Sequence, residues 1–177
     1  MDNNLNLSPD GQLAFALAAL RGLDRAGPLE AGQHLVPGVF FSVDPETTNR
    51  VEVESRPGEI LSARLVVEEP GRWLSLNFDL GRADLTGCGI IGFAIKSDSP
   101  GTTTCRVCIR TGTEDGPKDV FFPKTLVSFP KTSLHLDVLQ LGHHPEIPPQ
   151  AEWRELVFFF EVVSQTLNIR DFRLFII

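Results

Sequence analysis

Apolar and polar residues alternate with a period of two along most of this chain, from Val39 to its last isoleucine. In the segment from 73 to 80, every second residue is apolar: Leu74, Leu76, Phe78 and Leu80. The residues between them are Trp73, Ser75, Asn77 and Asp79. Such alternation is typical of a strand that buries one face and exposes the other, so this segment predicts a half-buried strand.

The same pattern recurs in several other segments, which are separated by turn residues such as Asp-Pro-Glu and Arg-Pro-Gly. It predicts strands at 39–43, 51–54, 61–67, 91–95, 104–110 and 133–138. Two shorter strands are predicted at 120–122 and 126–129, because Pro123 is expected to break the run between them. In the segment 133–138, we expect Leu134, Leu136 and Val138 to face the core, with His135 and Asp137 facing solvent.

The segment from Trp153 to Ile177 contains two strongly apolar runs around a polar break at 164–166. Val, Ile and Phe dominate both runs, so we predict two strands joined as a hairpin, which a second layer must cover. In the second run, the apolar parity changes between Ile169 and Phe172. That change predicts a bulge near Asp171, or a strand covered on both faces.

The first 32 residues follow a different pattern from the rest of the chain. Ser8, Pro9 and Asp10 are suited to the start of a helix, and the segment 12–23 is rich in Ala and Leu. Gly27-Pro28 marks the end of this helical segment. Its apolar stripe contains Leu13, Phe15, Leu17 and Leu20. The helix either packs across the sandwich or docks onto a second copy or a partner chain.

These elements predict an all-β fold, an antiparallel jelly-roll β-sandwich of about ten strands with one N-terminal α-helix. No helices separate the strands, which excludes a parallel α/β sheet. A chain of 177 residues is long enough to form such a core without disulfides or metals. We expect residues 1–32 to form the helical segment and residues 33–177 to form the sandwich domain.

The charge of the chain indicates which partners to expect, and its cysteines indicate its cellular compartment. The formal net charge is −7 and no cluster of Lys or Arg is present, so nucleic acid and anionic membranes are not expected as partners. No apolar stretch is long enough to span a bilayer, and no secretory signal is recognisable. Three cysteines, an odd number, argue against a disulfide framework. We therefore expect a cytoplasmic protein with reduced thiols.

The order of these features resembles a known group of folds. The stretch from Trp73 to Leu80 comes first, followed by Ala94-Ile95-Lys96 and a strand that carries arginines. The late runs that begin at Trp153 and Ile169 complete the pattern. Over residues 35–177 it is similar to the jelly-roll sandwiches of carbohydrate-binding modules and the wider galactose-binding-like group. The resemblance implies an aromatic platform, for which Trp73 and Trp153 are the candidates, and a structural calcium ion at Asp171.

Four polar residues are candidates for a ligand-binding patch. Arg106 and Arg110 share one face of their strand, and His135 and Asp137 share one face of another. If the two strands are neighbours, these side chains can hydrogen-bond sugar hydroxyls or a carboxylate. Ordinary cross-strand charge pairing on a solvated face is the alternative.

The sequence contains no convincing catalytic or metal-binding motif. Cys105 and Cys108 are three apart, so on a strand they face opposite sides, whereas a zinc knuckle needs both on one turn. Thiols without a role are expected, and a Cys3His zinc site with Cys88 and His143 is the alternative. No nucleophile motif is present. We therefore predict a non-catalytic binding module for a carbohydrate or a similar polar ligand. A structural or dimerisation module and a small sugar-processing enzyme are the alternatives.

Overall fold

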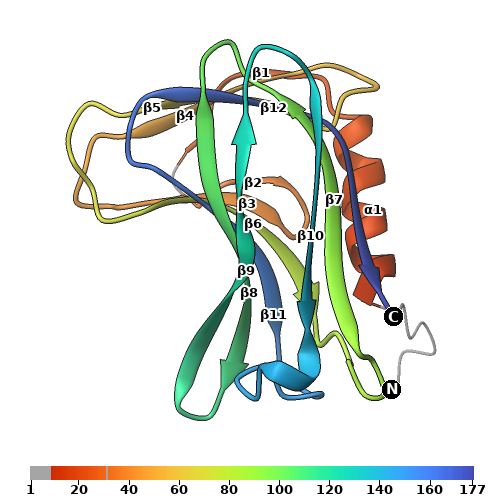
Figure 1. The fold of residues 1–177 in the computed structure, drawn as a ribbon. Coiled ribbons are helices and arrows are strands. Elements are labelled where there is room, and N and C mark those ends of the chain that lie inside the picture. The colour runs from red at the N-terminus through yellow and green to blue at the C-terminus, as the bar shows by residue number, and fades with distance from the viewer. Residues whose placement is uncertain (1–8, 31) are drawn as a thin grey trace.

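The computed structural model describes residues 9–30 and 32–177, and it shows two antiparallel sheets packed face to face (Figure 1). We name each sheet after one of its central strands. The β12 sheet has the order β1-β4-β5-β12-β7-β10, and the β11 sheet has the order β2-β3-β6-β11-β8-β9. The strands of the β12 sheet are β1 (Arg25–Pro28), β4 (Arg50–Ser55), β5 (Leu61–Val66), β7 (Ile90–Asp98), β10 (Ser133–Gln140) and β12 (Gln165–Ile176). Those of the β11 sheet are β2 (His34–Val36), β3 (Val39–Val43), β6 (Leu74–Gly81), β8 (Thr103–Thr113), β9 (Gly116–Ser128) and β11 (Arg154–Phe160).

The predicted all-β sandwich with one N-terminal helix is confirmed, with twelve strands in the described residues where about ten were expected. The sequence analysis missed β1 and β2, which are short and lack a clear alternation. It was also wrong to divide β9 at Pro123. The register between β8 and β9 shifts between Arg106 and Cys108, so that Pro123 lies in a bulge and needs no ladder hydrogen bond.

The core lies between the sheets and is built from the apolar parity of the predicted strands. In β6 the four predicted core residues are all buried: Leu74, Leu76, Phe78 and Leu80. The prediction of an exposed opposite face is wrong for this strand, because Ser75 and Asn77 are buried as well. Aromatic rings meet across the two layers at its centre. Phe78 packs edge-on against Phe158 with ring centroids 5.7 Å apart, and it stacks on Phe172 at the same distance. Edge-to-face and offset aromatic contacts of this kind stabilise a core beyond the area that they bury.

The two C-terminal runs are strands, but the prediction that they pair as a hairpin is wrong. β11 pairs with β6 and β8, whereas β12 pairs with β5 and β7 in the opposite sheet. Each run therefore covers the other across the core, and the rings of Phe158 and Phe172 are 5.8 Å apart. The predicted bulge near Asp171 is confirmed by a register shift between Ile169 and Asp171.

Helix α1 (Pro9–Arg21) contacts β2, β6 and β12, so it packs beside both sheets (Figure 1). Leu13, Leu17 and Leu20 are buried as predicted, but Phe15 is 64% exposed and does not join them. Pro9 begins the helix, while the predicted cap Ser8 lies outside the described residues. Among the residues described, no helix has the length and apolar character needed to cross a bilayer.

In strand β10 the side chains that face the core are the opposite set from the predicted one. Leu134 and Leu136 are 72% and 49% exposed, whereas Asp137 is buried and His135 stacks on Phe93 with ring centroids 5.6 Å apart. The inward position of Asp137 is stable because its carboxylate accepts hydrogen bonds from the backbone N–H groups of Lys124 and Val138, at 2.7 and 2.9 Å. The hydrogen bond from β9 thus decides which residues of β10 face inward.

Candidate functional site

The outer face of the β11 sheet gathers polar and aromatic side chains in three rows that run across the strands. The first row contains Asp119, Arg110, Glu155 and Asp79. The second contains Phe121, Cys108, Val157, Asn77 and Phe40. The third contains Thr125, Arg106, Phe159, Ser75 and Ser42. All of them have the parity opposite to the core residues of the same strands, because side chains alternate along a strand.

Two arginines and two phenylalanines form a cluster on this face, which we call the Arg–Phe cluster. The Arg106 guanidinium lies 4.0 Å from the ring centroid of Phe121, and that of Arg110 lies 5.4 Å from the ring centroid of Phe159. The two rings are 6.0 Å apart. Cation–π contacts orient the arginines over the rings. Cys108 lies between these large side chains in the rows and is completely buried, although it points away from the core.

Beside the cluster lies a network of polar groups. Asn77 donates a hydrogen bond from Nδ2 to Glu155 Oε2 (3.1 Å), and the Ser75 hydroxyl donates to Asn77 Oδ1 (2.8 Å). Arg110 binds both carboxylate oxygens of Asp119 at 2.7 Å, a bidentate pair. Partial burial raises the pKa of Glu155 above its ordinary value, and the neighbouring acids act in the same direction. Asn77 and Ser75 are themselves buried, so the network holds the half-buried Glu155 carboxyl group in place on this face.

Both tryptophans lie on this same face, next to opposite ends of the sheet's central strands. Trp73 precedes β6 and donates from Nε1 to the Ser42 hydroxyl at 3.0 Å, which fixes its ring. Trp153 precedes β11 and packs against Gly112 so closely that a side chain at that position would overlap the indole. Four of the predicted site residues, Arg106, Arg110, Trp73 and Trp153, therefore share one surface.

His135 and Asp137 do not join them. β8 belongs to the β11 sheet and β10 to the β12 sheet, so the condition for a shared patch, that the two strands are neighbours, is not met. The His135 and Asp137 side chains also face the interior. Burial lowers the pKa of His135, and its Nε2 atom is buried without a partner. These residues and Arg106 therefore do not converge on one catalytic site.

The surroundings of Asp171 do not fit a calcium ion. Its carboxylate binds the Arg21 guanidinium at 2.5 Å and accepts a hydrogen bond from the backbone N–H of Phe172 at 3.0 Å. Calcium requires six to eight oxygen ligands, and a guanidinium already supplies the balancing charge here. Within residues 9–30 and 32–177, no group of three or more His, Cys, Asp or Glu could hold a metal ion. Cys88, Cys105 and Cys108 are all free thiols.

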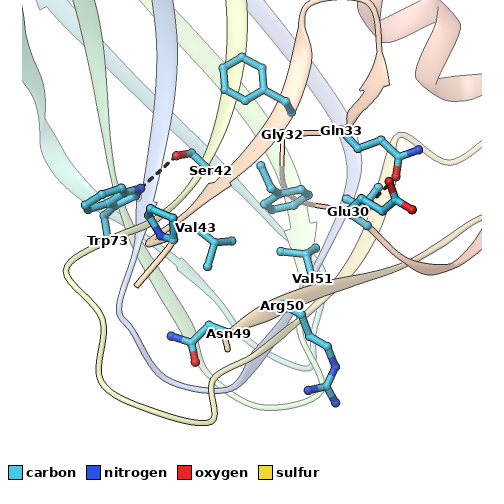
Figure 2. A pocket seen from close by; sticks show the side chains of 13 residues that line it. Glu30, Gly32, Gln33, Ser42, Val43, Asn49, Arg50, Val51 and Trp73 are labelled. Atoms are coloured by element: carbon cyan, nitrogen blue, oxygen red, sulfur yellow. Dashed lines mark hydrogen bonds between the residues drawn. The ribbon is translucent and has the colours of Figure 1, made fainter. Parts of the chain in front are cut away.

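Two hollows flank the outer face of the β11 sheet. The smaller, of about 330 Å³, lies over the Arg–Phe cluster and is lined by Arg106, Phe121, Phe159 and Glu161, among others. The larger, of about 390 Å³, lies at the edge of the sheet between β3 and the start of β4 (Figure 2). Ser42 and Trp73 belong both to this pocket and to the outer face. The third row of residues thus runs from one hollow to the other.

The sequence analysis missed four residues of this site: Asn77, Phe121, Glu155 and Phe159. The alternation did place Asn77 on the outer parity of β6. In the run Leu156 to Phe160 the core parity is shared by Leu156, Phe158 and Phe160, so Phe159 was readable as an outward-facing aromatic residue. Phe121 carried no such signal, because Val120, Phe121 and Phe122 are all apolar and the run does not show which side faces outward.

No protein-family model matches this sequence, and no curated protein sequence matches it. Solved structures do match its fold. A CBM4 carbohydrate-binding module shares 16% identity with a TM-score of 0.55, covering 85% of this chain and 94% of that one.

Two further modules match in the same way. The family 11 carbohydrate-binding module from Clostridium thermocellum, in complex with a β-1,3-1,4-mixed-linked tetrasaccharide, shares 10% identity over 84% of this chain and 94% of that one, with a TM-score of 0.52. The N-terminal cellulose-binding domain of β-1,4-glucanase C from Cellulomonas fimi shares 9% identity over 78% and 88%, with a TM-score of 0.51. At these identities the similarity establishes the fold, a β-sandwich like that of carbohydrate-binding modules, as the sequence pattern predicted.

Proposed function

We propose that this protein is a non-catalytic carbohydrate-binding module whose ligand lies on the outer face of the β11 sheet. The observation that carries the proposal is the Arg–Phe cluster next to the half-buried Glu155 carboxyl group, which Asn77 holds in place. A sugar ring offers apolar C–H groups on its faces and hydroxyl groups around its rim. Aromatic surfaces complement the former, and guanidinium and carboxyl groups hydrogen-bond the latter.

The direction of the rows supports a chain-like ligand. The third row crosses five strands, from Thr125 on β9 to Ser42 on β3. At about 4.8 Å between neighbouring strands, that row spans about 19 Å. A surface of that length suits an oligosaccharide laid across the strands better than a single sugar. The mixed-linked tetrasaccharide held by the Clostridium thermocellum module is an example of the ligand class that we propose.

Isothermal titration calorimetry with this mixed-linked tetrasaccharide and with xylo-oligosaccharides tests the proposal. Arg106→Ala and Phe159→Ala should each weaken binding about tenfold or more, because each removes one half of a stacked pair. Arg173→Ala is the matched control, since Arg173 is an exposed arginine on the β12 sheet. Equal binding by all four proteins, or no binding to any glycan of a broad array at millimolar concentration, would contradict the proposal.

A second candidate function, self-association, is favoured by a different surface. Leu134 and Leu136 are 72% and 49% exposed on β10, an edge strand of the β12 sheet. Neighbouring exposed apolar residues are typical of interaction surfaces. Light scattering on the protein and on the double variant Leu134→Lys/Leu136→Lys tests this candidate. A dimer that dissociates in the variant supports it, and a monomer in both contradicts it.

A further inference from the structure

The pocket at the edge of the β11 sheet has a mainly apolar wall. Its aromatic residues are Phe40, Phe41 and Trp73. Its aliphatic residues include Val43 and Val51, which Figure 2 labels. They come from β3, from the start of β4 and from the residue before β6, so the pocket opens between the edges of the two sheets. Its volume of about 390 Å³ falls within the usual size range of small-molecule sites.

Several of the polar groups around the pocket already have partners within the protein. Asn49 donates from Nδ2 to the Glu69 carbonyl (2.9 Å), and its Oδ1 accepts from the backbone N–H of Glu68 (2.8 Å). Gln33 Oε1 accepts from Arg25 Nη2 at 2.8 Å.

The same holds for two other groups at the pocket. Arg50 is paired with Glu68 and Glu52, and the Trp73 indole N–H is bound to Ser42. Groups that are engaged in this way contribute little new hydrogen bonding to a ligand, because an existing bond would have to break. The pocket therefore offers mainly apolar contact.

The pocket is continuous with the proposed glycan surface. Phe40 lies opposite Asn77 in the second row and Ser42 lies opposite Ser75 in the third, and both also line the pocket. A chain that follows the third row from Arg106 therefore reaches the mouth of the pocket at Ser42. The group at that end of the ligand would leave the polar rows and enter apolar surroundings.

We infer that this pocket is a subsite for an apolar ring attached to the glycan, such as an aryl substituent. The inference rests on the proposed function, because the glycan on the outer face brings the substituent to the pocket. Three aromatic residues in the wall favour a planar ring, which can stack in offset or edge-on geometry. Removing the ring from water provides the driving force, as for any apolar burial.

The test compares phenyl β-D-glucopyranoside with methyl β-D-glucopyranoside, which differ only in the aglycone. Binding is followed by ¹H–¹⁵N NMR, with the amides of Val43 and Val51 and the indole of Trp73 as reporters of the pocket. The phenyl glucoside should shift these signals and bind about tenfold or more tightly than the methyl glucoside. The Val43→Arg variant, which fills the half-buried wall, should abolish that preference.

Val127→Arg is the matched control, since Val127 is an exposed valine on β9 and does not line the pocket. A second variant, Phe40→Ala, removes ring contact without adding bulk. Because Phe40 also lies in the second row, its readout is the ratio of the two affinities, and the preference for the phenyl glucoside should fall. The NMR spectrum of each variant reports whether it is folded. If Val43→Arg unfolds the protein, Phe40→Ala decides the question.

The inference and the proposed function fail in different ways. If the mixed-linked tetrasaccharide binds, but the phenyl glucoside shifts the pocket signals no more than the methyl glucoside does, the subsite is wrong and the glycan surface stands. If the phenyl glucoside shifts the pocket signals but no glycan binds in the calorimetric test, the proposed function is wrong, and the pocket has no link to a glycan. Loss of the phenyl preference in Val127→Arg as well as in Val43→Arg would also overturn the subsite.

Discussion

The two outer faces of the sandwich are built differently. On the β11 sheet, large aromatic and charged residues alternate with small ones, and Val157 and Cys108 are completely buried between them. On the β12 sheet, the equivalent rows place exposed Leu136 beside Ala94 and Arg173. Around Val157 and Cys108 the outer face of the β11 sheet is a layer of touching side chains, whereas Leu136 and Arg173 on the β12 sheet are exposed to solvent. A touching layer holds its side chains in place before a ligand arrives, which is what a binding surface requires.

The largest difference in stability between variants of the two sheets should come from two arginines, one in each sheet. Arg154 on β11 is completely buried and donates to the carbonyls of Ala83 and Pro148 and to the Thr111 hydroxyl. Arg154→Met should lower the free energy of unfolding by about 3 kcal/mol or more, because it leaves these acceptors unsatisfied. Arg173→Met, on the exposed side of the β12 sheet, should change it by less than about 0.5 kcal/mol. Urea denaturation of both variants measures the contrast, and equal losses would contradict it.

A second contrast concerns apolar residues that point outward on each sheet. Val157→Lys should destabilise the protein by roughly 3 kcal/mol, because Val157 is completely buried within the outer layer and the ammonium would be desolvated. Leu136→Lys should be nearly neutral, since Leu136 already lies in solvent. Thermal unfolding of the two lysine variants tests this. A neutral Val157→Lys would show that the outer layer of the β11 sheet is open.

His135 and Glu155 should change the stability of the protein in opposite directions as the pH rises. Burial lowers the pKa of His135 from its ordinary value of 6.5, so as the pH falls below that value the unfolded chain binds a proton that the folded chain does not, and stability falls. Burial raises the pKa of Glu155 from 4.5, so stability falls as the pH rises through the range just above 4.5. Urea midpoints between pH 4 and 8 should lose the first slope in His135→Phe and the second in Glu155→Gln. If a variant keeps the slope of its urea midpoint against pH, that slope comes from another group.

The smallest expected effect is on thiol reactivity. Burial raises the pKa of Cys108 to about 12 and also raises that of Cys105, so neither thiol should react with a thiol reagent in the folded protein. Cys88 is partly exposed and should react. Phe121→Ala opens the layer above Cys108, so a second thiol should react slowly in that variant. Reaction of all three thiols at one rate in the native protein would argue against the covered layer.

Most of the fold was predictable because alternation fixes the buried parity wherever the two parities differ clearly in polarity. The segment 73–80 is such a case, with only apolar residues on the parity that faces the core; the alternation did not show that Ser75 and Asn77 on the other parity are buried too. β10 is the opposite case, because both of its parities hold residues that can be buried once a hydrogen-bond partner is present. The backbone N–H of Lys124 supplies that partner to Asp137. No local pattern records it, so the orientation of β10 was predicted wrongly.

The candidate site was predictable only in part, for a related reason. Arg106, Arg110 and Trp73 were placed on outward parities, and Trp153 was a candidate through the resemblance. Their assembly into one surface depends on the order of strands in the sheet. Strand order is set by contacts between residues far apart in sequence, such as Phe159 with Phe121. The error of the C-terminal hairpin has the same origin, because a short polar break between two strands leaves open whether they pair or face each other.

The central position of β12 has a consequence for the order of assembly. β12 joins β5 on one side to β7 on the other, and these two strands do not pair with each other. Until residues 165–176 are in place, this layer therefore consists of two separate blocks, β1-β4-β5 and β7-β10. Joining them requires contacts between Leu61 and Ile169, more than one hundred positions apart along the backbone. Folding should accordingly be slow, with closure of this layer as a late and cooperative event.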